Sequence, residues 1–590
     1  MRVAIIGMGT AGVSVLRHLV KFEKFNQLEV DVYDNDKNMG QGKPFQDDSE
    51  DLLTNVPTSM ISLNQDNIHE FKEWYEAHDE YQYGNADYLP RFVFGHYMRD
   101  QLETFHSSFQ NINIITNEVT QMYIEEANDA IIPRTIHICT KNDETTCKKY
   151  DYVFLTIGTL SYNDPYHLKG TKNYIHSPYP ANRTLDNVKD TDRIVIIGSG
   201  LASLDVIRHT VKHHQNKPII VASRSGKMPS VRGEMIDITL KYLTLEQFDA
   251  LKQKHMGCVP LDEAIALFKK ECEALNIPLQ RLLKRRKYDA IRDLTYDLNH
   301  PQELGKFQSL LEVIKENMDW IWNSFSRDDQ EQFIRKYQRY IVENSNPMPR
   351  ETAQLVLENI KSGHIQIYSG LEDLRHYYGK FRLKFKNQDE VLKAEVVINA
   401  TGAKKHLSQL DDDDALLLDI ANRQIIQSHP MGGIQIVPAT NEVISPLYGT
   451  LNNLRAIGQI TNGVNYYRNG IPSIVQQAVR SVHNLYDTLE KRAMTNQDDY
   501  ENHSPHSIQN VNATENSDTA FKELQEKVDV SQKPKHKDDK KNKKIKKKKK
   551  IRKRNIRKNI RRKRNIRKRK SKNTPLYESN DCKIKYVKLI

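Results

Sequence analysis

The sequence has few cysteines and no long apolar stretch. None of its cysteines falls in a Cys-x-x-Cys pair or in a metal-ligand spacing; the five are Cys139, Cys147, Cys258, Cys272 and Cys582. This pattern predicts a reducing, cytoplasmic location and no catalytic dithiol. No run of about 18 apolar residues is present, and glycines interrupt the apolar segment from Val3 to Leu19. We therefore expect neither a signal peptide nor a membrane span.

The positive charge of the chain is confined to its C-terminal end. The formal net charge is +12, but residues 533–590 hold 29 Lys and Arg against four Asp and Glu, which leaves residues 1–532 at −13. From residue 496 onward large apolar side chains are too sparse to offset the entropy of ordering. The sequence thus predicts a disordered tail over 496–590 that is strongly basic from 533. Such a tail would bind nucleic acid or anionic surfaces nonspecifically; the alternative is a low-complexity extension without a role.

The N-terminal 35 residues have the pattern of a strand, a tight turn, a helix and a second strand. The apolar run Val3–Ile6 is typical of a strand buried on both faces. The turn after it has the spacing G-x-G-x-x-G, in which bare glycine backbone can approach a pyrophosphate at a helix N-terminus. Asp34 ends the second strand, where its carboxylate would accept hydrogen bonds from a ribose. We predict a dinucleotide site made by Gly7, Gly9, Thr10, Ala11, Gly12 and Asp34.

A second unit of the same kind begins near residue 193. After the strand Ile194–Ile197, the motif has Gly198, Gly200 and, in place of the third glycine, Ser203. The next strand ends in Ser-Arg-Ser and carries no acid that would repel a ribose 2′-phosphate. Arg224 could bind that phosphate, which favours NADPH over NADH. The alternative is that Arg224 is a solvated surface cation.

Two further turns follow apolar strands, at Thr156–Gly158 and at Thr401–Gly402, and suggest that the chain crosses between two domains there. Such turns also let backbone pass close to a cofactor, so Thr156 and Gly158 are candidate cofactor-binding residues; the alternative is an ordinary turn at the end of a strand. The predicted fold class is α/β, with two Rossmann-type dinucleotide-binding domains, a helical insertion and the disordered tail. The predicted boundaries are 1–185 for the first part of an FAD-binding domain and 186–400 for an NAD(P)H-binding domain with its helical insertion at about 234–345. Residues 401–495 form the second part of the FAD-binding domain, and 496–590 the tail.

Several segments resemble the bacterial FAD/NAD(P)-binding oxidoreductases typified by YdhS, which are related to flavin-containing and N-hydroxylating monooxygenases. They are the first glycine motif and the stretches 40–45, 52–57, 90–97 and 174–179. The resemblance covers roughly residues 1–490. It implies that a set of residues lies along FAD: Gly42, Asn55, Val56, Pro57, Arg91, Gly458 and Gln459. Gln459 stands where such folds usually have an acid.

The resemblance implies an FAD-dependent oxidoreductase reduced by NAD(P)H, with a small-molecule substrate and, as a narrower hypothesis, monooxygenase chemistry with oxygen. Two alternatives stay open: a flavin-binding redox sensor or scaffold, and a polyanion-binding protein that acts through its tail. No residue is a convincing general base, His176 included. His209 and His213 have the i, i+4 spacing of metal ligands, but the sequence offers no third ligand, so we expect no metal site.

Overall fold

The computed structural model describes residues 1–503, except residues 85, 127–133, 286–288, 387, 389 and 469. The last helix, α16 (Ile471–His503), runs past the predicted start of the tail at 496. The rest of the predicted tail, 504–590, lies outside the described residues, as does its basic segment. None of the described helices is long and apolar enough to cross a membrane.

The first sheet is parallel except at one edge, with the strand order β16-β17-β7-β1-β2-β3. Its strands are β1 (Arg2–Ile6), β2 (Glu29–Tyr33), β3 (Ile112–Ile115), β7 (Tyr152–Leu155), β16 (Glu442–Ser445) and β17 (Gly449–Ala456). Alternate residues of β1 face opposite sides: Val3 and Ile5 pack in one core, and Ala4 and Ile6 in another. The sheet is therefore buried on both faces, as its continuous apolar strands require.

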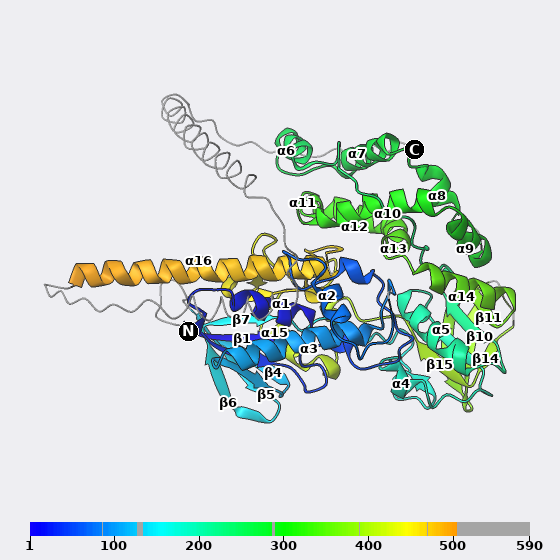
Figure 1. Cartoon of the computed structure of the whole chain (residues 1–590), viewed down its shortest axis with the longest axis horizontal. Helices are drawn as coiled ribbons and strands as arrows, with labels where there is room; N and C mark the ends of the chain where they lie inside the picture. Colours follow the sequence, from blue (N-terminus) through cyan, green and yellow to red (C-terminus); the bar gives the residue numbers. More distant parts are fainter. Residues whose placement is uncertain are drawn as a thin grey trace, which may run out of the picture. The chain divides into compact units, whose positions relative to one another are not determined.

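Helices cover one face of this sheet. They are α1 (Thr10–Leu19), α2 (Glu70–Glu76), α3 (Arg91–Ser108) and the first half of α16. Helix α1 contacts both α3 and α16, and Figure 1 shows α16 running alongside α1. The opposite face carries a three-stranded antiparallel sheet of β4 (Val119–Glu126), β5 (Arg134–Thr140) and β6 (Asp143–Tyr150), together with α15 (Ala415–Asn422).

The second sheet is entirely parallel, with the order β11-β10-β9-β15-β8. Its strands are β8 (Tyr174–Ile175), β9 (Ile194–Ile197), β10 (Ile219–Ser223), β11 (Ile365–Ser369) and β15 (Val396–Asn399). Helices α5 (Leu201–His213) and α14 (Arg350–Lys361) pack on one face, with the short α4 (Ala181–Thr184). An antiparallel sheet of β12 (Leu371–Tyr377), β13 (Lys380–Phe385) and β14 (Leu392–Ala394) covers the other.

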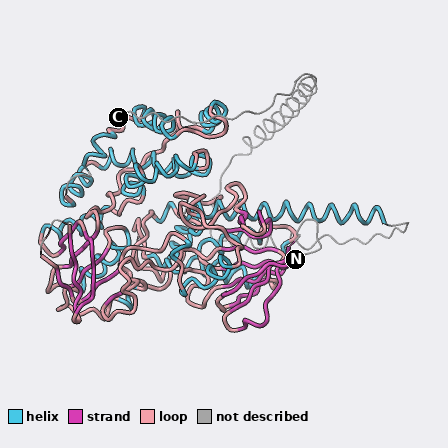
Figure 2. The backbone as a smooth tube through the Cα atoms, turned by 180° about the vertical axis from the view of Figure 1, so that it is seen from behind, coloured by secondary structure: helices cyan, strands magenta, loops and turns pink. Residues whose placement is uncertain are grey.

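Both sheets are thus built in the same way: two successive parallel strands joined by a helix, a third parallel strand, an antiparallel meander, and a last strand beside the first. Figure 2 shows the strands gathered in two separate groups. The two meanders were not predicted from the sequence. Their strands mix polar and apolar residues and contain no continuous apolar run like that of β1 or β9; β13, for example, alternates exposed and buried residues.

The segment between β10 and α14 is helical. It comprises α6 (Leu245–Lys254), α7 (Leu261–Ala274), α8 (Leu279–Arg285), α9 (Ala290–Asn299), α10 (Pro301–Glu316), α11 (Met318–Trp322), α12 (Arg327–Lys336) and α13 (Gln338–Ser345). Trp322 is fully buried in the core of this segment and stacks on Tyr466 at a ring distance of 4.0 Å. Its indole N–H donates to the Gly463 carbonyl at 2.8 Å. The insertion is therefore anchored on the chain segment that precedes α16.

Short 3₁₀ helices occupy several connections, at Phe25–Gln27, Lys43–Phe45, Thr58–Met60, Leu407–Gln409, Asp412–Asp414 and Gln459–Thr461.

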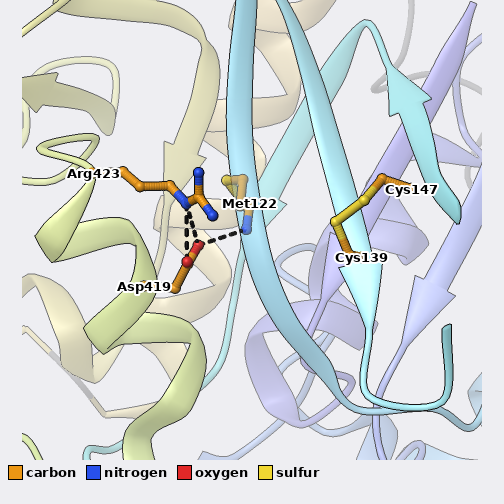
Figure 3. The surroundings of a disulfide bond; sticks show 5 residues. All are labelled: Met122, Cys139, Cys147, Asp419 and Arg423. Carbon is orange, nitrogen blue, oxygen red and sulfur yellow. Dashed lines mark hydrogen bonds and ion pairs between the residues drawn. A yellow bond between two sulfur atoms is a disulfide. The ribbon is translucent and has the colours of Figure 1, made fainter. Parts of the chain in front are cut away.

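Cys139 and Cys147 form a disulfide between the neighbouring strands β5 and β6 (Figure 3). The spacing of the cysteines in the sequence did not predict this bond. Eight positions separate the two cysteines, and the tight β5–β6 connection brings their Cα atoms to 4.4 Å. Nearby, Asp419 of α15 accepts a hydrogen bond from the Met122 N–H of β4 at 2.9 Å and pairs with Arg423, which ties α15 to the meander.

Candidate functional site

A cavity of about 1060 Å³ opens at the carboxyl end of the first sheet. Residues from the first sheet, from α5, from the helical insertion and from the start of α16 line it. The predicted site residues among its lining are Gly7, Gly9, Thr10, Ala11, Asp34, Gly42, Asn55, Val56, Arg91, Thr156, Gly158, Gly458 and Gln459. The predicted residues outside its lining are Gly12, Pro57, Gly198, Gly200, Ser203 and Arg224.

The turn after β1 is shaped by close backbone contacts. Gly7 has a φ of +98°, and a Cβ there would lie 2.6 Å from the carbonyl oxygen of Thr156. The Thr156 hydroxyl donates to the Gly7 carbonyl at 2.6 Å and holds the two segments together. A Cβ on Gly42 would lie 2.9 Å from the Cα of Gly9, so a side chain at Gly42 is excluded where these two lengths of backbone line the cavity. A cradle of bare backbone at the start of α1 fits a pyrophosphate.

Gly12 lies in the first turn of α1, and its role is in packing. A Cβ at this position would overlap the Gly7 carbonyl oxygen. In this motif the third glycine allows the helix and the strand to pack closely. The position of Gly12 outside the cavity lining agrees with that role.

Asp34 lies at the rim of this cradle, at the end of β2. Its carboxylate accepts hydrogen bonds from the Met8 N–H at 2.7 Å and the Asn35 N–H at 2.8 Å. Burial raises the pKa of Asp34 above its ordinary 3.8, and these N–H donors oppose the rise only in part. A half-buried carboxylate beside the glycine turn is the acceptor that a ribose hydroxyl needs.

The second glycine motif repeats the backbone relationship of the first. Gly198 has a φ of +110°, and a Cβ there would lie 2.5 Å from the Ala400 carbonyl oxygen at the end of β15. Gly200, the N-cap of α5, is exposed, with no atom within 4 Å of a Cβ position. The Ser203 hydroxyl is fully buried and has no hydrogen-bond partner among the described residues. Arg224 is exposed at the end of β10.

The helix that follows the second glycine motif reaches the cavity, although the motif residues themselves do not line it. Leu201 and Ala202, which follow Gly200, line the same cavity as Gly7 and Gly9. A ligand on the first cradle and one at the start of α5 would therefore approach each other in this space, as an electron donor and acceptor must.

An ion pair links the two nucleotide units at this cavity. One terminal nitrogen of Arg91, at the start of α3, contacts both carboxylate oxygens of Asp205 on α5 at 2.7 Å. The Tyr179 hydroxyl donates to the same carboxylate at 2.6 Å, and the Arg91 Nε donates to the Leu53 carbonyl at 2.9 Å. Burial alone would lower the pKa of Arg91, but the Asp205 carboxylate outweighs it and raises that pKa. Arg91 was predicted as a flavin neighbour, and its partner Asp205 was not predicted at all.

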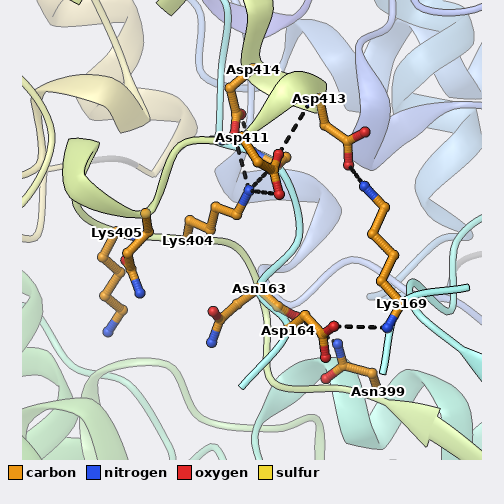
Figure 4. A network of polar contacts seen from close by, with 11 residues as sticks. Asn163, Asp164, Lys169, Asn399, Lys404, Lys405, Asp411, Asp413 and Asp414 are labelled. Carbon is orange, nitrogen blue, oxygen red and sulfur yellow. Dashed lines mark hydrogen bonds and ion pairs between the residues drawn. The ribbon is translucent and has the colours of Figure 1, made fainter. Parts of the chain in front are cut away.

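The two segments that cross between the units are also clamped together (Figure 4). Lys404, almost fully buried, donates to the Ser161 hydroxyl at 2.6 Å and pairs with Asp414 at 3.2 Å. Asp414 in turn accepts hydrogen bonds from the N–H and the hydroxyl of Ser161, both at 2.7 Å. Lys169 pairs with Asp413 beside this group. Because Asp413 and Asp414 line the cavity, the clamp lies directly against the candidate site.

The cavity wall also includes residues from elsewhere that the sequence did not identify. Arg232 donates to the Asn55 carbonyl at 2.8 Å, and Lys315 of α10 pairs with Glu312 at 2.8 Å. Burial raises the pKa of Glu316, and the nearby Glu312 adds to the rise. Gly458, a predicted residue of the lining, donates its N–H to Gln477 of α16 at 3.1 Å. His176 is not among the lining residues.

The comparisons agree with this architecture. A protein-family model described as FAD-NAD(P)-binding matches residues 4–160. Ornithine N-hydroxylase from Kutzneria sp. 744 is 12% identical, with a TM-score of 0.51, over 83% of this chain and 99% of that chain. L-Lysine 6-monooxygenase from Pseudomonas syringae is 12% identical, with a TM-score of 0.51, over 82% and 99%. The reduced form of ornithine hydroxylase from Pseudomonas aeruginosa is 14% identical, with a TM-score of 0.50, over 83% and 99%.

No curated protein matches the chain. At 12 to 14% identity the solved structures establish the fold alone. The predicted α/β fold class with two dinucleotide-binding units is confirmed, and the first unit carries an FAD-NAD(P)-binding domain.

Proposed function

We propose that the protein is an FAD-dependent oxidoreductase reduced by NADPH, and that it acts as a monooxygenase on a small molecule with oxygen as the electron acceptor. One observation carries the proposal: the same glycine turn, crossed by the backbone that follows a neighbouring strand, occurs at Gly7 and at Gly198. Both turns lead into helices whose first residues line one cavity. Two nucleotides can thus be bound with their reactive ends in a common space.

FAD would be held by the first cradle. Gly7, Gly9, Thr10 and Ala11 would present backbone N–H groups to the pyrophosphate, and Asp34 would accept from a ribose hydroxyl. The remaining contacts would come from Gly42, Asn55, Val56, Pro57, Arg91, Thr156, Gly158, Gly458 and Gln459. Bound FAD supplies two-electron chemistry, taking electrons from a nicotinamide and giving them to an acceptor.

NADPH would be held by the second turn, through Gly198, Gly200 and the start of α5, with Arg224 on the 2′-phosphate. The chain's own contribution to the reaction is positioning and the exclusion of water. The Arg91–Asp205 pair fixes α5 against α3, and the insertion helices form the far wall of the cavity. NADH has no 2′-phosphate for Arg224 to bind.

The substrate class is supported by the position of the cavity and by the neighbours. The Kutzneria structure holds FAD, NADP+ and L-ornithine, and the Pseudomonas syringae protein is a lysine monooxygenase. We infer a small molecule bound between the nucleotide units and the insertion. Membership of the YdhS-like group and a cytoplasmic location are part of the same proposal.

The test is an absorption spectrum of the purified full-length chain, followed by anaerobic titration with NADPH and then NADH. The proposal predicts a flavin spectrum that NADPH bleaches faster than NADH, and recovery of the oxidised spectrum when oxygen is admitted. A colourless protein that takes up no added FAD would overturn it. Bound flavin that neither nucleotide reduces would favour the redox-sensor or scaffold alternative.

A further inference from the structure

A cluster of metal-ligating side chains lies where the loop before Leu52 meets helix α5. Asp51, His209 and His213 each offer one ligand atom, and these atoms all lie within 4.8 Å of one another. Asp51 and His209 are buried, and His213 is exposed. The sequence alone showed the two histidines on one helix face; the third ligand comes from a loop about 160 positions earlier, which only the fold brings to them.

The donor chemistry is that of a first-row transition metal. Two imidazoles and one carboxylate form a ligand set that zinc and its neighbours accept, with further positions open to water. The His209 Nδ1 lies 3.8 Å from a carboxylate oxygen of Asp51. Ligand atoms bound to one ion at about 2.0–2.1 Å stand at comparable separations. The rings of His209 and His213 lie 4.9 Å apart, so both can turn toward one point beside Asp51.

A second carboxylate orients the central histidine. The Nε2 of His209 lies 3.4 Å from Asp186, on the opposite side of the ring from Asp51. Metal-binding histidines commonly donate their other N–H to a carboxylate, which fixes the ring and raises the basicity of the ligating nitrogen. Asp186 stands where such a carboxylate is required.

We propose that Asp51, His209 and His213 bind a divalent transition-metal ion such as Zn²⁺, with Asp186 as the group that orients His209. The Ser49 hydroxyl, 3.1 Å from His209 Nδ1, and water would complete the shell. The site would be formed by both nucleotide units, because Asp51 belongs to the loop that leads to Asn55 and Val56, while both histidines lie on α5. A bound ion would thus tie the cavity wall to the second unit, whatever reaction the cavity supports.

Lys212 competes with the metal ion for the Asp51 carboxylate, and this competition makes the proposal testable. Its ammonium group pairs with the Asp51 carboxylate, although the lysine side chain is 60% exposed. A cation can therefore displace the ammonium group into water. Removing the positive charge of Lys212 should therefore strengthen metal binding. If the cluster only forms hydrogen bonds, removing this charge should leave metal binding unchanged.

The experiment is a titration of the full chain with ZnCl₂ by calorimetry, together with elemental analysis after dialysis and with Mg²⁺ as the control ion. We expect one Zn²⁺ per chain and no Mg²⁺ binding. His213→Ala, which alters an exposed side chain, should weaken Zn²⁺ binding at least tenfold. Asp186→Asn should weaken it about 10–100-fold, as loss of a supporting carboxylate does elsewhere. Lys212→Met should tighten it.

Two matched variants serve as controls, His106→Ala on α3 and Lys189→Met, both at exposed positions. Neither should change Zn²⁺ binding. Zn²⁺ should also raise the melting temperature of the wild-type chain but not of His213→Ala, because a ligand that binds only the folded state stabilises it. The proposal is overturned if wild type and Lys212→Met both fail to bind Zn²⁺, or if binding survives unchanged in His213→Ala. None of these outcomes depends on flavin or NADPH.

Discussion

Arg91 and Asp205 form a buried ion pair that joins the two nucleotide units: one guanidinium nitrogen lies 2.7 Å from both oxygens of the carboxylate. The side chains are 15% and 8% exposed. Because both groups face the cavity, the contact that holds the units together is also part of the wall against which the cofactors would lie.

Breaking the Arg91–Asp205 ion pair should destabilise the folded protein. Asp205→Asn keeps the shape but leaves the Arg91 charge buried without its partner, which should lower the free energy of unfolding by about 3–5 kcal/mol. Urea denaturation measures the loss. We also expect slower flavin reduction by NADPH, followed by stopped-flow absorbance. The exposed pair Arg2–Glu29 is the control, since Arg2→Gln should cost only about 0–1 kcal/mol. If Asp205→Asn lowers the free energy of unfolding by no more than Arg2→Gln does, the Arg91–Asp205 pair does not hold the two units together.

Gly200→Ala tests the second nucleotide site without straining the protein. Gly200 has a φ of −93°, which alanine adopts freely, and nothing lies within 4 Å of the added Cβ. A pyrophosphate that approaches this backbone would meet the new methyl group, so the Kd for NADP+ should rise about tenfold or more. Calorimetry measures that Kd, and FAD content checks that the first site is intact. Unchanged NADP+ affinity would mean that no pyrophosphate binds there.

Arg224→Ala tests the choice between the two nicotinamide cofactors. An arginine that binds a 2′-phosphate contributes about 1.5–3 kcal/mol, so the KM for NADPH should rise roughly 10–100-fold while that for NADH stays the same. Steady-state NAD(P)H oxidation measures both. Equal effects on the two cofactors, or none, would assign Arg224 to the solvated surface instead.

The pH dependence of stability should report on Asp34. Because burial raises its pKa in the folded state, the folded protein binds more protons than the unfolded chain at pH values just above 3.8. Without flavin, Asp34 thus makes the protein less stable as pH rises through that window. The free energy of unfolding of Asp34→Asn, minus that of the wild type, should increase with pH in denaturant titrations between pH 3.5 and 7. If this difference in the free energy of unfolding stays constant or falls as the pH rises, the Asp34 carboxylate is not buried in the folded protein.

The disulfide should stabilise the chain without serving the flavin. The Cys139–Cys147 bond closes a short loop, and its loss in the double variant to serine should lower the free energy of unfolding by about 2–3 kcal/mol. Neither cysteine is among the residues that line the cavity. We therefore expect the rate of flavin reduction by NADPH to be the same in wild type and variant. A slower rate would indicate that the disulfide takes part in electron transfer after all.

The parallel sheets could be predicted from the sequence because one strand near the centre of each is a continuous apolar run that leads into a glycine turn. Val3–Ile6 and Ile194–Ile197 are such runs, and both lie at the centre of a sheet. The meanders were not predicted, because their strands mix polar and apolar residues and no glycine motif accompanies them. The disulfide depends on the register of β5 and β6, which is irregular between Ile138 and Thr140.

At the candidate site, local motifs identified the residues of the cradle but not the contacts between units. Gly7, Gly9 and Asp34 could be recognised because one short segment contains the whole pattern. Asp205 is an ordinary helix residue by sequence, and Asp51 an ordinary loop residue. Their significance comes from packing between segments more than 100 positions apart, which periodicity and spacing do not encode.

The central claim is that one chain binds two nucleotides at once. The most direct measurement is calorimetric titration of NADP+ into flavin-loaded protein while flavin fluorescence monitors release. We predict one NADP+ per chain, bound without displacement of FAD and with a selectively raised Kd in Gly200→Ala. Displacement of FAD by NADP+, or saturation with a single nucleotide in total, would contradict the claim.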